Sequence, residues 1–431
     1  FNVGVGHGAG EGITTGLNNT LIGSLAGDAL TDADNNVAIG YQTLSTNTVG
    51  SKSTAIGSFA LFNQNPATAV DMFNTAVGYD AGNGVTTGIL NTLVGGLAGD
   101  GLTTGSRNVA FGKDALTADT LGSRSTAIGF ATLYSQNFTT ATDAYNVAVG
   151  EQAGLTLTTG TGNTLIGGLA GDSLTDADRN IAIGYLALPA DTLGSRSIAI
   201  GIGALEVQNF TSATNTYNIA IGYDTGNSIE TGVKNTLIGG LTGETITTGD
   251  YNVIIGYSNV SAAVGTDTQI IIGQSLNGVG SNNFTFGNGG TDSNIAFGET
   301  SITAPSDQRY KEDIADATAG LAFIKDLRPV TFKWKKEKDV PSDHPAYVEG
   351  SDKRVMLSNG ETNHGFIAQE VKTAIDNHSE IKDGFRMWSE QGLDEDGNST
   401  GGRQRLGDGA LIPMLVKAIQ ELEARIATLE G

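Results

Sequence analysis

The sequence contains no cysteine, and it has few prolines and few basic residues. Without cysteine the fold can have neither disulfides nor thiolate metal sites, and the redox compartment stays open. The chain also lacks any apolar run that approaches the length of a membrane span. Its formal net charge of −22 would repel nucleic acid and anionic membranes. We therefore expect no nucleic-acid partner, no membrane insertion, and neither a metal nor a cofactor.

The scarce basic residues are distributed unevenly along the chain. Residues 1–305 contain 7 Lys/Arg against 23 Asp/Glu, whereas residues 306–431 contain 17 against 23. Of the seven prolines, only Pro66 and Pro189 precede residue 300. This change in composition predicts a domain boundary near residue 305. The expected domains are a repetitive shaft over 1–298, a tip and linker over 299–305, and a C-terminal module over 306–431.

The first two-thirds of the chain is dominated by a short motif that ends in glycine. It consists of Asn or Ser, then Thr, Val or Ile, then Ala or Leu, then Ile, Val or Phe, then Gly, as in NTLIG ending at Gly23. From Gly6 onward the gaps between motif glycines run 17, 17, 17 and 21, a cycle of 72 residues, and they shorten to 14 and 11 at Gly287 and Gly298. Such a period predicts a rod of stacked β-solenoid rungs, because no rung can bury its own apolar face.

Within each motif the second and fourth positions are β-branched or aromatic, and the third is small or aliphatic. This pattern predicts a five-residue strand with its larger side chains on one face, ended by a glycine where the backbone turns or packs closely. Every fourth rung carries four extra residues that include Phe or Tyr. These inserts predict a protrusion or lateral ridge, which either covers the rod's own apolar seam or contacts a receptor. They lie within Asn63–Phe73, Thr132–Tyr145 and Val207–Tyr217.

The repeat resembles the Asn/Ser-x-Ala-Ile-Gly repeats of trimeric bacterial adhesin heads and of phage tail-fibre shafts. The resemblance covers roughly residues 1–300. It implies parallel β-rolls that are stable only as trimers, although the dominant 17-residue period is longer than the adhesin repeat.

The C-terminal module follows a different pattern. A helix is expected over 316–326, a strand over 330–334, and a second helix from about 365 to His378. The last helix, over about 411–430, has apolar residues at alternating spacings of three and four, which is the a/d seam of a coiled coil. Isoleucine at a with leucine at d favours a parallel dimer, whereas the resemblance of the rod implies a trimer. The seam consists of Ile412, Leu415, Ile419, Leu422, Ile426 and Leu429.

Three segments of this module, SDQRYKEDI from Ser306, HGFIAQEV from His364 and the closing helix from Leu411, carry a second resemblance. Together they are similar to the self-cleaving intramolecular chaperone of phage tail spikes and fibres, including endosialidase spikes. The resemblance implies that three chains trimerise through this module, that the rod folds against it, and that the module then cuts itself off between Pro305 and Ser306. By motif position Ser306 corresponds to the catalytic serine and Lys311 to its base.

The residue chemistry is consistent with this assignment. A serine hydroxyl needs a base to take its proton, and a lysine serves as that base only where burial brings its pKa toward neutrality. Release would then be tied to folding, and the activity would be at most that of a single-turnover serine endopeptidase. For His364 we expect a structural role rather than catalysis or metal binding.

The sequence thus predicts a mainly β protein with an elongated trimeric β-solenoid shaft, a small α+β domain and a terminal coiled-coil helix. We expect the distal part of a phage tail fibre in the virion, made in the host cytoplasm. It would form a homotrimer and bind a host cell-surface receptor, either a glycan or an outer-surface protein. Because Phe1 lies inside a repeat, we expect attachment to other tail proteins through a part that precedes it. A bacterial trimeric surface adhesin, a glycan-degrading tail spike and a non-cleaving chaperone remain alternatives.

Overall fold

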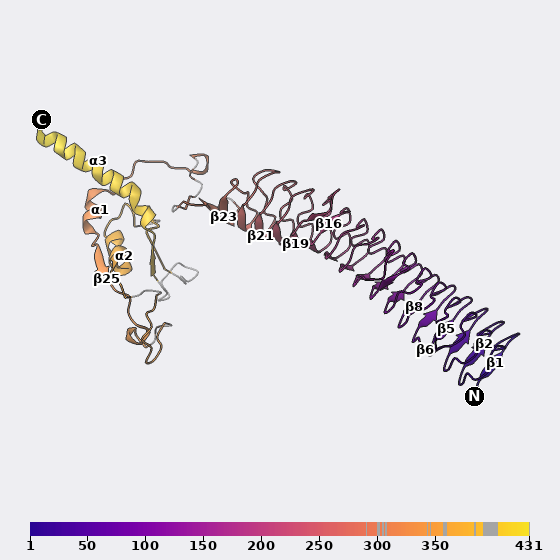
Figure 1. Cartoon of the computed structure of the whole chain (residues 1–431). Helices are drawn as coiled ribbons and strands as arrows, with labels where there is room; N and C mark the ends of the chain where they lie inside the picture. Colours follow the sequence, from indigo (N-terminus) through magenta and orange to yellow (C-terminus); the bar gives the residue numbers. More distant parts are fainter. Residues whose placement is uncertain are drawn as a thin grey trace. The chain divides into compact units, whose positions relative to one another are not determined.

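The computed structural model describes residues 1–289, 291–299, 302–303, 306, 308–342, 344, 346–356, 360–382, 385–390 and 404–430. The chain divides into two compact units, Phe1–Ser306 and Asp307–Gly431. We call the first the shaft and the second the C-terminal unit (Figure 1).

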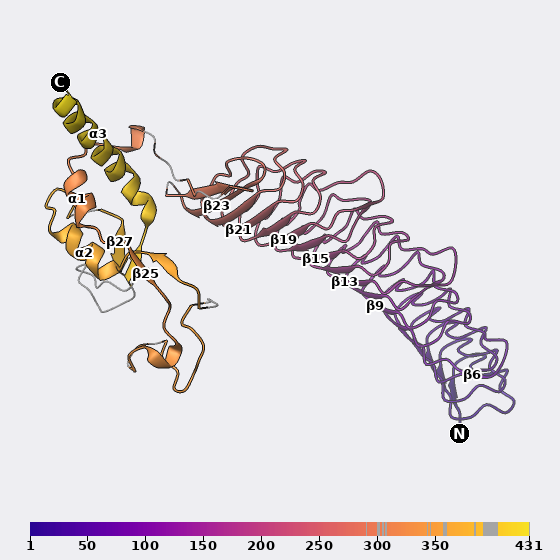
Figure 2. The ribbon, with the colours of Figure 1, turned by 60° about the vertical axis from the view of Figure 1, so that its left-hand side comes forward.

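The shaft is a β-solenoid that contributes one short strand per turn to a single 18-stranded sheet (Figures 1 and 2). Seventeen of the strands are parallel and pair in register, so that motif positions align from rung to rung, as in Thr20 with Val37 and Gly256 with Gly273. The glycine spacing therefore correctly predicted the rungs. The parallel strands are β1 (Val3–Val5), β2 (Thr20–Ile22), β3 (Val37–Ile39), β5 (Thr54–Ile56), β7 (Thr75–Val77), β8 (Thr92–Val94), β9 (Val109–Phe111), β11 (Thr126–Ile128), β13 (Val147–Val149), β14 (Thr164–Ile166), β15 (Ile181–Ile183), β17 (Ile198–Ile200), β19 (Ile219–Ile221), β20 (Thr236–Ile238), β21 (Val253–Tyr257), β22 (Ile270–Gln274) and β23 (Asn283–Asn288).

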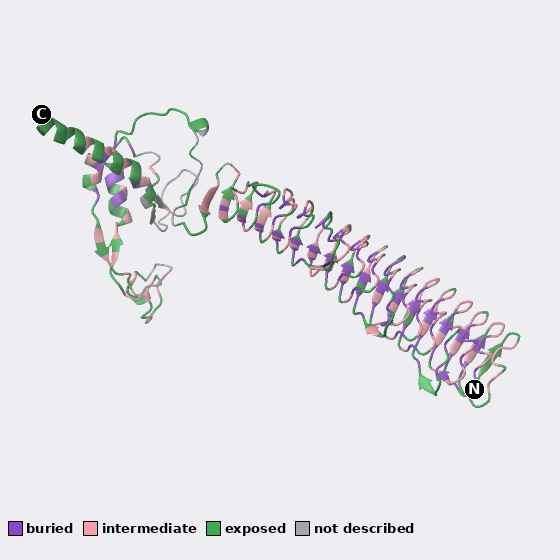
Figure 3. Ribbon diagram, turned by 45° about the horizontal axis from the view of Figure 1, so that its top comes forward, coloured by how far each residue is buried: buried purple, intermediate pink, exposed green. Residues whose placement is uncertain are grey.

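In these strands the larger apolar side chains face outward, although large apolar residues usually face the core. The central residue is a buried Ala or Leu in most strands, as at Leu21 and Ala38, and a buried Ile or Thr in the last three parallel strands, whereas the flanking residues lie on the outer surface, as at Ile22. Most strands are three residues long instead of the expected five. The interior of a rung is thus filled by small or medium-sized side chains. Figure 3 shows the buried residues running along the inside of the shaft.

A column of buried asparagines accounts for the first position of the motif. The Asn180 side-chain oxygen accepts the backbone N–H of Ser197 at 2.8 Å, and its amide nitrogen donates to the Gly194 carbonyl at 2.9 Å. The N–H of Asn180 in turn donates to the side-chain oxygen of Asn163 at 2.9 Å. The column thus satisfies backbone groups that are shut off from water, which would otherwise destabilise the fold.

In every fourth rung the motif begins with serine, and a glutamine from the insert takes over the missing amide contacts. Gln208 donates to the Ser197 hydroxyl at 2.9 Å and to the Asp191 carboxylate at 2.6 Å, and its carbonyl accepts the Asn218 amide at 2.8 Å. Burial raises the pKa of Asp191 above its ordinary value. The chain around each insert forms a small two-stranded sheet. These pairs are β4 (Gly50–Ser51) with β6 (Val70–Asp71), β10 (Gly122–Ser123) with β12 (Thr142–Asp143), and β16 (Gly194–Ser195) with β18 (Thr214–Asn215).

The inserts fold against the rod. Phe138 is only 5% exposed and Phe210 only 7%, so these aromatic residues cover the rod's own interior, one of the two predicted alternatives. Tyr145 and Tyr217, at the end of the same inserts, remain exposed on the surface.

The parallel array ends at β23. The next strand, β24 (Ser293–Ala296), also precedes a motif glycine, Gly298, but it pairs antiparallel to β23. Only 11 residues separate Gly287 from Gly298. That length is too short for another solenoid turn, so the chain reverses instead.

The C-terminal unit packs three helices and two short antiparallel sheets around a small core that includes Phe323, Val371, Ile375, Met387 and Leu411. The helix expected from 316 begins later, at Leu321, and the other two helices start within a few residues of their predicted positions. Among the helices that the structure describes, none is both long and apolar enough to cross a bilayer. The elements are 3₁₀ turns η1 (Gln308–Tyr310), η2 (Glu337–Asp339) and η3 (Asp408–Ala410), helices α1 (Leu321–Asp326), α2 (Ala368–Asp376) and α3 (Leu411–Glu430), and strands β25 (Val330–Phe332) with β26 (Asn363–Gly365) and β27 (Trp388–Glu390) with β28 (Gln404–Leu406).

Candidate functional site

The predicted cleavage point lies where the two compact units meet in the sequence. The division falls between Ser306 and Asp307, one bond from the predicted cut. Ser306 is exposed to solvent, and Pro305 lies outside the described residues.

Lys311 follows the short 3₁₀ turn η1, where its backbone N–H donates to the Gln308 carbonyl at 3.0 Å. The turn lies between Ser306 and Lys311 in the sequence. Lys311 is exposed in the single chain. A lysine accepts a proton at neutral pH only where burial or neighbouring cations lower its pKa. The single chain does not provide that burial.

The predicted helical seam is present on α3 and is exposed along its length. Ile412 is 63% exposed, Ile419 64% and Leu429 86%. Leu422 and Ile426 line an open groove together with Ile419, Ala427 and two glutamates. Apolar side chains exposed at coiled-coil spacing indicate a helix that needs partner helices.

The start of α3 and its middle are fixed to the unit's core. Leu411 is buried, and Glu421 accepts the N–H of Leu321 at 3.0 Å, so that a carboxylate caps the start of α1. Arg328 forms a two-point ion pair with Glu370 of α2. The contacts of Leu411 and Glu421 fix α3 to the unit, and the Arg328–Glu370 pair joins the chain just after α1 to α2. The outer part of α3 is exposed, as its green colour in Figure 3 indicates.

The segment HGFIAQEV supplies structure to this unit. His364 lies in β26 with its side chain exposed, and Val371 of α2 is buried in the core. His378, at the end of α2, contacts Asp326 at 2.9 Å and Glu380 at 3.1 Å, and its ring packs edge-on against Phe323. The hydrogen bond to Asp326 raises the pKa of His378. No sequence pattern predicted the contact between His378 and Asp326, because the two residues are 52 positions apart.

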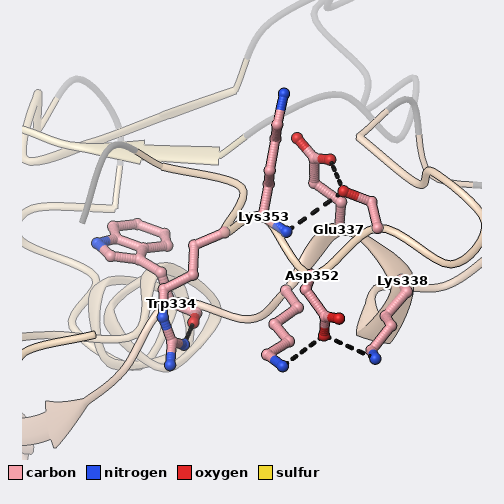
Figure 4. A network of polar contacts seen from close by, with 8 residues as sticks. Trp334, Glu337, Lys338, Asp352 and Lys353 are labelled. Carbon is pink, nitrogen blue, oxygen red and sulfur yellow. Dashed lines mark hydrogen bonds and ion pairs between the residues drawn. The ribbon is translucent and has the colours of Figure 1, made fainter. Parts of the chain in front are cut away.

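The basic stretch that follows β25, residues 335–338, forms a defined polar network (Figure 4). Lys336 and Lys338 both contact the Asp352 carboxylate, at 2.5 and 2.7 Å, and hold its pKa at about 2. The Ser351 hydroxyl donates to Glu337 at 2.6 Å, and Arg354 donates to the Trp334 carbonyl. The stretch is therefore paired with a returning segment about 15 residues later, and all of these ion-paired groups are exposed. Such surface pairs contribute little stability.

Comparison with known proteins identifies one family in this chain. Residues 306–380 match the family model described as the chaperone of endosialidase. The match begins at Ser306 and includes Lys311 and the HGFIAQEV segment, and it ends before α3. No curated protein and no solved structure matches the chain. The family match, next to a β-solenoid shaft, supports an endosialidase-type tail fibre with a C-terminal chaperone.

Proposed function

We propose that this protein is the distal part of a phage tail fibre whose C-terminal unit assembles the shaft and is then released. The fibre is a homotrimer in the virion, bound to other tail proteins, and its shaft meets a glycan or protein on the host surface. The observation that carries this proposal is that the chaperone match starts at residue 306, where the solenoid unit ends.

Association of three chains starts at α3. Its exposed seam, from Ile412 to Leu429, buries apolar surface only when other helices cover it. Bringing three copies of α3 together also brings the three linked shafts to a high local concentration, which favours their folding side by side.

Cleavage then proceeds from the residues at the junction. The Ser306 hydroxyl attacks the carbonyl carbon of Pro305 while Lys311 takes its proton. The peptide bond breaks, the Ser306 nitrogen leaves as an amine, and an ester joins Pro305 to the Ser306 oxygen. Water hydrolyses this ester to the Pro305 carboxylate. Because Lys311 is exposed in the single chain, the packing of neighbouring chains supplies the burial that activates it, and cleavage follows assembly.

A denaturing gel tests this proposal with three variants beside the wild type. We expect wild type to split into two fragments and Ser306→Ala to stay as one band. Leu422→Arg, which places a charge in the α3 seam, should slow the cut strongly. Gln420→Arg changes an exposed residue of the same helix that lies outside the seam, so this variant should cleave as wild type does. One intact band in wild type would remove the peptidase claim, and normal cleavage in Leu422→Arg would remove the link to assembly.

A further inference from the structure

The outer face of the shaft's long sheet has an unusual composition. On all seventeen parallel strands, from Val5 on β1 to Phe286 on β23, the residue before the motif glycine is Val, Ile or Phe and points outward. The other outward position, two residues earlier, is Thr, Val, Ile or Phe throughout. We call these two columns the outer face. The 23 acidic residues of residues 1–305 all lie outside it.

This face is accessible in the single chain. Ile166 and Ile238 are each 37% exposed, and Phe111 is 55% exposed. At the usual spacing of about 4.8 Å between strands, the Val, Ile and Phe residues before the motif glycines form an apolar strip roughly 80 Å long. In the neighbouring column, seven of the seventeen residues are threonine. Soluble monomers rarely expose a continuous apolar patch of that extent. A sheet that faced water would alternate its outward positions with charged or strongly polar residues.

We infer that this outer face is the surface along which copies of this chain pack against one another over the whole length of the shaft. Two outward residues on each of seventeen strands exceed the roughly 20–30 residues that each side of a stable interface contributes. A partner must offer an apolar strip of the same length, with rungs at the same spacing. The same face of a second copy meets both conditions. The number of chains, three, rests on the proposed function, whereas the choice of face does not.

The two edges of the outer face differ in charge, and this difference orients the packing. At the edge before each strand, a corner column contains six of the seven basic residues of residues 1–305, each with a positive φ. The edge after the motif glycine is more acidic: it carries Asp80, Asp114, Glu151 and Asp224, against the single basic residue Lys113. The six basic residues are Lys52, Arg107, Arg124, Arg179, Arg196 and Lys234.

Opposite charges attract, so parallel copies place the basic edge of one chain beside the more acidic edge of the next. Such a contact joins different surfaces of the two chains, and repeated around an axis it closes into a ring. The apolar columns then face the axis, where corresponding residues of the copies approach one another.

Because the chain has no cysteine, single cysteines report this geometry directly. In the full chain, Ile238→Cys on the outer face is treated with a short bis-maleimide and run on a denaturing gel. Thr231→Cys, an exposed position of the same rung outside the outer face, is the matched control. Ile166→Cys, one 72-residue cycle earlier, repeats the test if Ile238→Cys fails to fold. Light scattering of the untreated variants gives the number of chains.

We expect covalently joined pairs of chains from Ile238→Cys and from Ile166→Cys, and single chains from Thr231→Cys. A trimer whose Ile238→Cys and Ile166→Cys forms do not cross-link would overturn the choice of face and leave the proposed trimer standing. Equal cross-linking of Thr231→Cys would also overturn it. A shaft that light scattering finds monomeric would overturn both.

Discussion

Replacing Asn180 with alanine tests whether the buried asparagine column holds neighbouring rungs together. Asn180 is fully buried, and its side chain makes one hydrogen bond to the Ser197 N–H and one to the Gly194 carbonyl. Alanine leaves both groups buried without a partner. Each such group costs about 1–3 kcal/mol, so the local loss is about 2–6 kcal/mol.

The loss should stay local, because each rung of a solenoid contacts only its neighbours. We therefore expect amide hydrogen exchange, followed by mass spectrometry, to accelerate at least about 30-fold in peptides covering residues 180–201, which corresponds to the lower bound of about 2 kcal/mol. Peptides two cycles away should be unchanged. Asn209→Ala is the control, because Asn209 is exposed and bonds only a threonine hydroxyl through its side chain. Unchanged protection over 180–201, or faster exchange along the entire shaft, would refute the reasoning.

Two further changes test the backbone and the C-terminal unit. Gly239→Ala should give less soluble protein, because the substitution destabilises the shaft by about 4 kcal/mol or more. The φ angle of Gly239 is +121°, and the added Cβ would lie 1.7 Å from the Gly256 carbonyl oxygen. Gly240→Ala, where the nearest atom is 3.8 Å away, should express normally, and equal yields of the two variants would contradict this account. The hydrogen bond to Asp326 raises the pKa of His378 in the folded protein. The stability that this contact contributes is therefore complete below the unfolded pKa of about 6.5, and it is lost as the pH rises through the pKa of the folded state. Tryptophan fluorescence reports the unfolding of the C-terminal unit, since Trp334 and Trp388 both lie there. The midpoint of this unfolding transition should decrease when the pH is raised from about 6 to about 8. The fall should be smaller in His378→Gln, and identical pH profiles would rule out the His378–Asp326 contact as its cause.

The spacing of the motif glycines was enough to predict the rungs, because a backbone that must repeat its path needs glycine at the same point of each turn. The direction of the side chains was harder to predict. In a strand such as Ile198–Ile200 all three residues are apolar, so alternation alone does not tell the inner face from the outer. Gln64, Gln136 and Gln208 recur at the 72-residue period. Each lies inside an insert, 11 residues after the motif serine that it contacts, so the spacing alone did not show that the glutamine replaces the missing asparagine.

At the candidate site, the sequence placed Ser306 beside the junction of the two units and identified the apolar seam of α3. It did not show that Lys311 is exposed in the single chain, because the exposure of a side chain depends on the fold around it. Nor could it show that Glu421 would cap α1, since a contact between residues 100 positions apart leaves no local pattern.

The antiparallel strand β24 has a consequence for the protein after release. A stack of parallel strands that simply stopped would end in a row of free backbone groups, and such an edge recruits strands from other molecules and leads to aggregation. Here β24 covers the last parallel strand, and Thr303 in turn pairs with Asn294 on β24. If the proposed cut after residue 305 occurs, β24 and Thr303 stay with the shaft and its last parallel strand remains covered, which would oppose end-to-end joining of shafts.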